Sequence, residues 1–163
     1  YHRNVRVLDT IFTRVLLEVA GASIAQILFM AILVMIDWID APHDVFYMLI
    51  AWFLMAMFAF GLGLIICAIA QQFDVFDKIW GTLSFVLLPI SGAFFFVHNL
   101  PAQAQSIALW FPMIHGTEMF RHGYFGDAVV TYESVGFLVV SDLALLLMGL
   151  VMVKNFSKGV EPQ

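Results

Sequence analysis

A short stretch in the last third of the chain carries the residues whose spacing is most suggestive of chemistry. His115, Glu118 and His122 follow one another at intervals of three and four residues, so they share one face of a helix. Imidazole and carboxylate groups gathered in this way can bind zinc. Glu118 can instead pair with Arg121 or His122, as helical neighbours commonly do. Zinc would need another ligand, and the same connection offers only His98, so we expect the ion pair and no metal.

A membrane-embedded enzyme built on these residues is the less favoured alternative. The sequence lacks the H-E-x-x-H spacing of zinc proteases and a Ser or Cys nucleophile within a known motif. It also lacks the G-x-x-x-x-G-K-S/T loop that cradles nucleotide phosphates. We therefore expect no catalytic residue and no cofactor, and we do not expect this chain to hydrolyse ATP by itself.

The elements that must position these residues are membrane helices. The chain is 63% hydrophobic and 12% charged and contains 17 Phe, which leaves too little polar surface for a water-soluble globule. A helix needs about 20 apolar residues to cross a bilayer. Four segments meet this requirement, namely 15–36, 45–70, 79–97 and 135–153. We predict an all-α membrane protein with four transmembrane helices.

The distribution of Lys and Arg predicts the orientation of these spans. Four spans place both ends of the chain on one side, and that side carries six of the seven basic residues. The other side carries only Arg121. Because basic residues favour the cytoplasmic side, we expect both ends in the cytoplasm, including the tail 154–163. The six residues are Arg3, Arg6, Arg14, Lys78, Lys154 and Lys158.

The connection 98–134 has apolar patches but no run of spanning length, because Pro112 and Gly116 interrupt it. We expect it on the periplasmic side, either as a re-entrant element beside a translocation path or as an interfacial loop with an aromatic belt. His115, Glu118 and Arg121 favour the re-entrant reading, since such side chains need partners at that depth.

Asp142 lies near the middle of the last predicted span. A charge there costs roughly 2.5 to 3.5 kcal/mol on insertion scales, so the side chain should face protein. It is either a polar group of a transport pathway or, as we favour, a carboxylate that is hydrogen-bonded to a neighbouring helix.

The pattern of the first eighteen residues, YHRNVRVLDTIFTRVLLE, predicts an amphipathic helix that enters the first span. This string resembles the loop and helix entry of type-2 ABC exporter permeases for capsular and related polysaccharides. In that family the pattern is similar to Y-R-x-V-x-x-x-D-T, then Arg, then L-L-E. The matching residues are Tyr1, Arg3, Val5, Asp9, Thr10, Arg14, Leu16, Leu17 and Glu18, with His2 as an extra residue. A second string, P-x-x-H-x-x-E-x-x-R, also resembles the family, through Pro112, His115, Glu118 and Arg121.

The resemblance covers essentially the whole chain and implies a fold and partners. Such permeases have six spans, form homodimers in the bacterial inner membrane, and work with a separate ATP-binding-cassette ATPase. The chain would be one permease domain, 1–163, with the last four spans, and its N-terminal part would be missing. The resemblance places the stretch 1–14 on the ATPase. The coupling candidates are Arg3, Asn4, Arg6, Asp9 and Arg14.

The expected cargo is a capsular or related polysaccharide, with or without a lipid anchor, and no nucleic acid is expected. Aromatic walls suit a conduit for sugar chains, which present apolar C–H faces. The conduit candidates are Phe94, Phe95, Phe96, Trp110 and Tyr124. An exporter of O-antigen, lipid or drug would also accept such walls. A secondary transporter would want inverted repeats and several intramembrane charges, which the sequence lacks.

Overall fold

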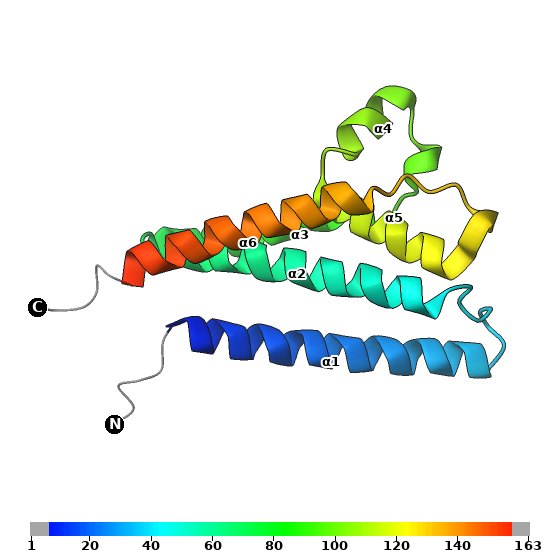
Figure 1. The fold of residues 1–163 in the computed structure, drawn as a ribbon, viewed down its shortest axis with the longest axis horizontal. Coiled ribbons are helices and arrows are strands. Elements are labelled where there is room, and N and C mark those ends of the chain that lie inside the picture. Colours follow the sequence, from blue (N-terminus) through cyan, green and yellow to red (C-terminus); the bar gives the residue numbers. More distant parts are fainter. Residues whose placement is uncertain (1–6, 158–163) are drawn as a thin grey trace, which may run out of the picture. The chain divides into compact units, whose positions relative to one another are not determined.

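The computed structural model describes residues 7–157, except for the side chains of residues 7–10, 74, 77, 156 and 157. The regular structure of this part of the chain consists of helices, without strands, as predicted (Figure 1). Its α-helices are α1 (Val7–Met35), α2 (Val45–Ala70), α3 (Asp74–Ile90), α4 (Ala102–Ala108), α5 (Pro112–Phe125) and α6 (Val135–Ser157). Two 3-10 turns accompany them, η1 (Val97–Asn99) and η2 (Gly126–Ala128). The chain forms two compact units, one containing α1 and the other spanning Pro42–Lys154.

Helix α1 joins the predicted amphipathic entry and the first predicted span into one element of 29 residues. Its stretch Ile11–Met35 is long and apolar enough to cross a membrane. The helix ends in a Schellman motif, because Trp38 N–H donates to the Leu33 carbonyl and Asp37 N–H donates to the Val34 carbonyl. Asp37 takes the left-handed conformation that this motif requires, with φ of 54°.

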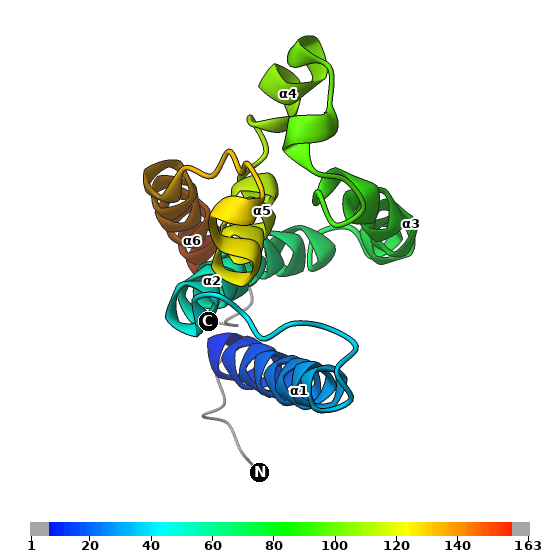
Figure 2. The same cartoon turned by 90° about the vertical axis from the view of Figure 1, so that its right-hand side faces the viewer.

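Helix α2 belongs to the unit Pro42–Lys154, and other helices of that unit pack against it. It begins and ends at the predicted residues, and the Asp44 carboxylate caps it by accepting from Tyr47 N–H at 2.9 Å. In the first core cluster, Ala51 and Leu54 of α2 pack with Met119 of α5 and Leu138 of α6. Figure 2 shows α3 and α6 on opposite sides of α5.

Helix α6 runs parallel to α2 and packs closely against it (Figure 1). A Cβ atom at Gly61 would lie 3.0 Å from Leu145 Cβ, and one at Gly149 would lie 2.6 Å from Leu64 Cβ. We call this contact, formed by Gly61, Leu64, Leu145 and Gly149, the α2–α6 seam. Gly61 permits this close packing, whereas Gly63 has nothing within 4 Å of such an atom.

Helix α3 differs from its prediction in both bounds. The expected span was 79–97, but the helix begins at Asp74 and ends at Ile90. Pro89 lacks an N–H in the last turn, and Gly92 at φ of 79° turns the chain away. Of the described helices, α1, α2 and α6 contain membrane-length apolar stretches, and α3 contributes a shorter one at Lys78–Ile90.

Candidate functional site

Helix α5 presents the predicted polar string to the rest of its unit. Pro112 occupies the first turn, where its missing N–H costs nothing, and Gly126 at φ of 57° ends the helix. Two glycines of α5 let it approach α2, because a Cβ at Gly116 or Gly123 would lie 2.6 Å from a methionine side chain of α2. This close approach buries one side of α5, including His115 and Glu118.

Arg121 binds the irregular segment that follows α3. Its Nη1 donates to the Phe95 carbonyl at 2.6 Å, and its Nη2 donates to the carbonyls of Gly92 at 2.6 Å and Ala93 at 3.2 Å. The guanidinium also lies 4.3 Å from the centre of the Phe96 ring, in cation–π geometry. One side chain of α5 therefore satisfies three carbonyls that have left the helical hydrogen-bond ladder.

Glu118 is fully buried and balances this charge. Its Oε1 accepts from Arg121 Nη1 at 2.9 Å, which confirms the predicted ion pair. Oε1 also accepts from Val97 N–H at 3.4 Å, and Oε2 accepts from Tyr132 N–H at 3.3 Å. The carboxylate thus joins the segment after α3 to the segment before α6.

His115 is 4% exposed and makes two hydrogen bonds to the main chain. Ser134 N–H donates to Nδ1 at 3.0 Å, so Nδ1 carries no proton. Nε2 lies 2.9 Å from the Leu109 carbonyl and must therefore be the protonated nitrogen that donates there. The neutral imidazole ties the turn before α5 to the start of α6. We call His115, Glu118 and Arg121 with these partners the α5 polar cluster.

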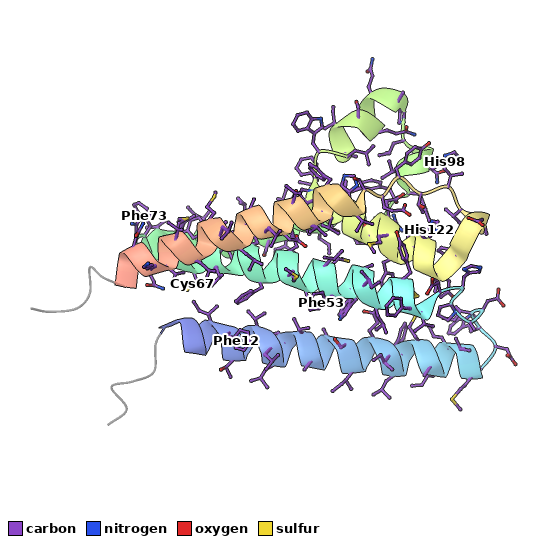
Figure 3. The ribbon with its side chains drawn as sticks, viewed as in Figure 1. Phe12, Phe53, Cys67, Phe73, His98 and His122 are labelled. Atoms are coloured by element: carbon purple, nitrogen blue, oxygen red, sulfur yellow. The ribbon has the colours of Figure 1, made fainter. Side chains whose placement is uncertain are left out.

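His122 stands apart from this cluster. Its Nδ1 lies 3.0 Å from Thr131 Oγ1 and 3.2 Å from Glu133 Oε1, and its ring meets the Tyr47 ring edge-on. His98 lies on η1, away from His122 (Figure 3), and stacks on Tyr132. Within the described residues, no three His, Cys, Asp or Glu side chains are arranged to hold a metal ion. Of the groups considered for zinc, His115, Glu118 and His122 instead contact other protein groups.

The aromatic residues predicted to line a conduit divide into two kinds. Phe94 and Trp110 are 73% and 79% exposed. Phe95 packs against a second core cluster, formed by Val97, Ala108 and Ile114. Phe96 lies under Arg121, and Tyr124 meets Phe125 edge-on. Phe95, Phe96 and Tyr124 are half-buried, so Phe94 and Trp110 are the most exposed of the five rings.

The predicted coupling residues fall mostly outside the described part of the chain. Arg3, Asn4 and Arg6 precede it, and Asp9 lies in α1 without a described side chain. Arg14 lies on α1 and is exposed. The prediction for this stretch stays a prediction.

Asp142 lies on α6 and is fully buried, so the expectation that it faces protein is confirmed. The favoured hydrogen bond to a neighbouring helix is wrong, because neither carboxylate oxygen has a hydrogen-bond partner among the described residues.

Sequence reasoning found the side chains of the α5 polar cluster but missed most of their partners. These partners are main-chain groups of Gly92, Ala93, Phe95, Tyr132 and Ser134, among others, and main-chain groups carry no sequence signal. Only Gly92 offered a hint, since a glycine after a helix often marks a turn. The arrangement holds the segments 91–97 and 131–134 on α5.

Three membrane-length helices and a helical segment held by buried polar groups define a multi-pass membrane protein. The chain belongs to the ABC-2 type transporter family, whose profile matches residues 2–125. This confirms the resemblance recognised in the sequence.

Named relatives agree with this assignment. Over 163 residues the chain is 98% identical to the capsule polysaccharide export inner-membrane protein BexB of Haemophilus influenzae, covering 100% of this chain and 62% of the relative. It is 66% identical to the capsule polysaccharide export inner-membrane protein CtrC of Neisseria meningitidis serogroup B, again over 100% of this chain and 62% of the relative. The polysialic acid transport protein KpsM of Escherichia coli is 29% identical over 94% of this chain and 60% of its own length. The chain thus spans less than two thirds of these relatives, and it is a protein of the bacterial inner membrane.

Proposed function

We propose that this chain is part of the permease subunit of an ATP-driven exporter that moves capsular polysaccharide across the inner membrane. The observation that carries the proposal is the 98% identity, over the whole chain, to a protein named for capsule polysaccharide export. Membership of the ABC-2 type transporter family supports the same function. O-antigen, a lipid or a drug is the alternative cargo.

The chain crosses the membrane four times in this proposal, with α3 as the shortest crossing. Its 17 residues extend about 26 Å, which is slightly less than a hydrocarbon core of about 30 Å. Local thinning of the bilayer can accommodate such a mismatch. Both ends then lie in the cytoplasm, because Lys78 and Lys154 fall on that side and Arg121 on the other.

The segment 91–134 forms a re-entrant element on the periplasmic side in this proposal. Irregular backbone at membrane depth needs hydrogen-bond partners within the protein. The α5 polar cluster supports this placement, because Arg121 and Glu118 provide partners for carbonyl and N–H groups of the irregular segments. Such an element would form the outer end of a transport path.

The conduit for the sugar chain lies between two copies of the permease in this proposal. Phe94 and Trp110 are the best candidates for contact with sugar, since their exposed rings can stack on the C–H faces of a pyranose. The half-buried rings of Phe95, Phe96 and Tyr124 complete the proposed wall of the conduit. Lipid surrounds the outer surface of the four crossings.

A separate ATPase subunit drives this permease from the cytoplasm in the proposal. The family supports such a partner, and the chain itself has no phosphate-binding loop. The stretch 1–14 would meet the ATPase through Arg3, Asn4, Arg6, Asp9 and Arg14. A rigid helix such as α1, with 29 residues, can transmit a push from that stretch into the membrane.

The test is to delete the full-length gene in an encapsulated strain that carries it. Polysaccharide should accumulate inside the cells and disappear from their surface, and a plasmid copy should restore it. Deletion of a polymer-forming glycosyltransferase is the control, because that strain should hold no polymer on either side. Normal surface polysaccharide in the deletion strain would contradict capsule export and favour one of the alternative cargoes.

A further inference from the structure

Asp142 lies on α6 one turn before a close contact between α6 and α2. Leu145 follows it by three residues and forms part of the α2–α6 seam opposite Gly61. A Cβ at Gly61 would also lie 3.1 Å from the backbone nitrogen of Leu146, so little more than van der Waals contact separates the two helices. Asp142, Leu145 and Gly149 follow one another at intervals of three and four residues, so Asp142 shares the face of α6 that forms the seam.

The carboxyl group of Asp142 is fully buried there, and both of its oxygens lack a hydrogen-bond partner among the described residues. It lies within the membrane-length stretch Val135–Asn155, where water is scarce. A carboxylate in such a place is much less stable than a neutral acid, which can donate its proton to a helix carbonyl.

The elements that pack against this face offer no charge to pair with it. Helix α2 has only Tyr47 and Cys67 as titratable residues, and they lie about 3.9 and 1.7 turns from Gly61 along the helix. On α5, both ring nitrogens of His115 bond to main-chain groups, and its ring meets Phe137, which lies five residues before Asp142, about 7.5 Å along α6. Lys154 of α6 is twelve residues further on, about 18 Å away. The other charged groups of α5 hold partners in segments 92–97 and 131–133; they are Glu118, Arg121 and His122.

We propose that Asp142 is a proton-binding site in the α2–α6 seam. The seam closes around the neutral acid, and the proton is released when α6 and α2 part far enough for water to reach the carboxyl. Proton release and seam opening are therefore linked, so acid conditions favour the closed seam and alkaline conditions favour the open one. The proposal does not depend on the cargo.

Infrared spectroscopy of the full-length protein in lipid nanodiscs tests the protonation state. The spectrum of the unsubstituted protein minus that of Asp142→Asn should contain the C=O band of a protonated carboxyl at neutral pH. Asp127→Asn is the matched control, because Asp127 is exposed and its loss should leave that band in place. A difference spectrum with carboxylate bands, or without a protonated carboxyl band, would overturn the proposal.

Two valine substitutions on the same helix test the link to the seam. Gly61→Val pushes against Leu145 and Leu146, whereas Gly63→Val has open space around it. In Gly61→Val the protonated band should disappear at a lower pH than in the unsubstituted protein, and Gly63→Val should leave it unchanged. Equal titration in both variants would refute the role of the seam. Selective carbon-13 labelling of aspartate in the unsubstituted protein reveals the same band without any variant, in case Asp142→Asn does not fold.

Discussion

Arg121 illustrates how a single side chain can organise a segment that has no regular structure. Carbonyl groups that leave a helix within an apolar environment need a donor, and water is scarce there. A guanidinium has five N–H donors in a fixed plane, which allows one residue to serve Gly92, Ala93 and Phe95 at once. Glu118, buried beside it, neutralises the charge and fixes its orientation.

We expect Arg121→Met to lower the stability of the full-length protein strongly. The substitution leaves the buried Glu118 without its counter-charge, and breaking a buried pair in this way costs about 3–5 kcal/mol. Thermal unfolding in detergent, followed by tryptophan fluorescence, measures the loss. Arg14→Met removes an exposed arginine and should change the midpoint little.

The double variant Glu118→Gln, Arg121→Met should recover part of that stability, since no buried charge is left unpaired. If it unfolds at the same temperature as Arg121→Met alone, the two residues do not act as a pair.

At the scale of the element, α5 depends on its glycines to lie on α2. At Gly123 an added Cβ would lie 2.9 Å from the backbone nitrogen of Met48 and 3.1 Å from the Asp44 carbonyl oxygen. The same contact carries two main-chain hydrogen bonds, because the N–H groups of His43 and Asp44 donate to the last carbonyls of α5. Backbone atoms cannot move aside as a flexible side chain can, so only glycine, which lacks a Cβ atom, fits at position 123.

We expect Gly123→Ala to destabilise the protein by about 1–3 kcal/mol, the usual range for an overpacked contact. In a helix without such a neighbour, the same change is neutral or stabilises by up to about 1 kcal/mol. Gly136→Ala in α6, where nothing lies within 4 Å, is the matched control. Thermal unfolding of the two variants decides the matter, and a loss of equal size in both would contradict the packing argument.

At the scale of the whole molecule, the proposed function requires a defined orientation in the membrane. An ATPase in the cytoplasm can reach the stretch 1–14 only if that stretch lies on the cytoplasmic side, which also places Lys78 there in a four-span topology. Segment 91–134 must then face the periplasm. The asymmetry of basic residues favours this arrangement.

Single cysteines introduced after Cys67→Ala test this orientation. A membrane-impermeant maleimide added to intact spheroplasts should label Trp110→Cys, whose native side chain is 79% exposed, and should not label Lys78→Cys. Disruption of the cells should make Lys78→Cys reactive. Labelling of Lys78→Cys from outside would place the presumed ATPase surface on the wrong side and end the exporter proposal.

Charge reversal in the stretch 1–14 tests the coupling to the ATPase. Arg6→Glu or Asp9→Lys should reduce surface polysaccharide several-fold and weaken co-purification with the ATPase, while the amount of protein in the membrane stays unchanged. Asp127→Lys, in the segment proposed to face the periplasm, is the control and should leave co-purification intact. Unaltered export in both coupling variants would remove the assignment of these residues.

The amino-acid sequence by itself determined that this is a helical membrane protein of a transport family. Length and apolarity place the bounds of α2 at the predicted residues, since a span is a local property of its own residues. Sequence also identified the Glu118–Arg121 pair, because an interval of three residues on a helix brings two side chains together.

Only the tertiary structure decided which groups these side chains bind. The carbonyls held by Arg121 are 26 to 29 residues away in sequence and have no side-chain signature. The early end of α3 at Ile90 follows from Pro89 and Gly92, whereas the contact of Gly92 with Thr117 and Ile114 of α5 depends on the tertiary structure. The burial of Asp142 likewise results from the packing of helices. The sequence alone does not predict whether a hydrogen-bond partner will lie within reach of this carboxylate.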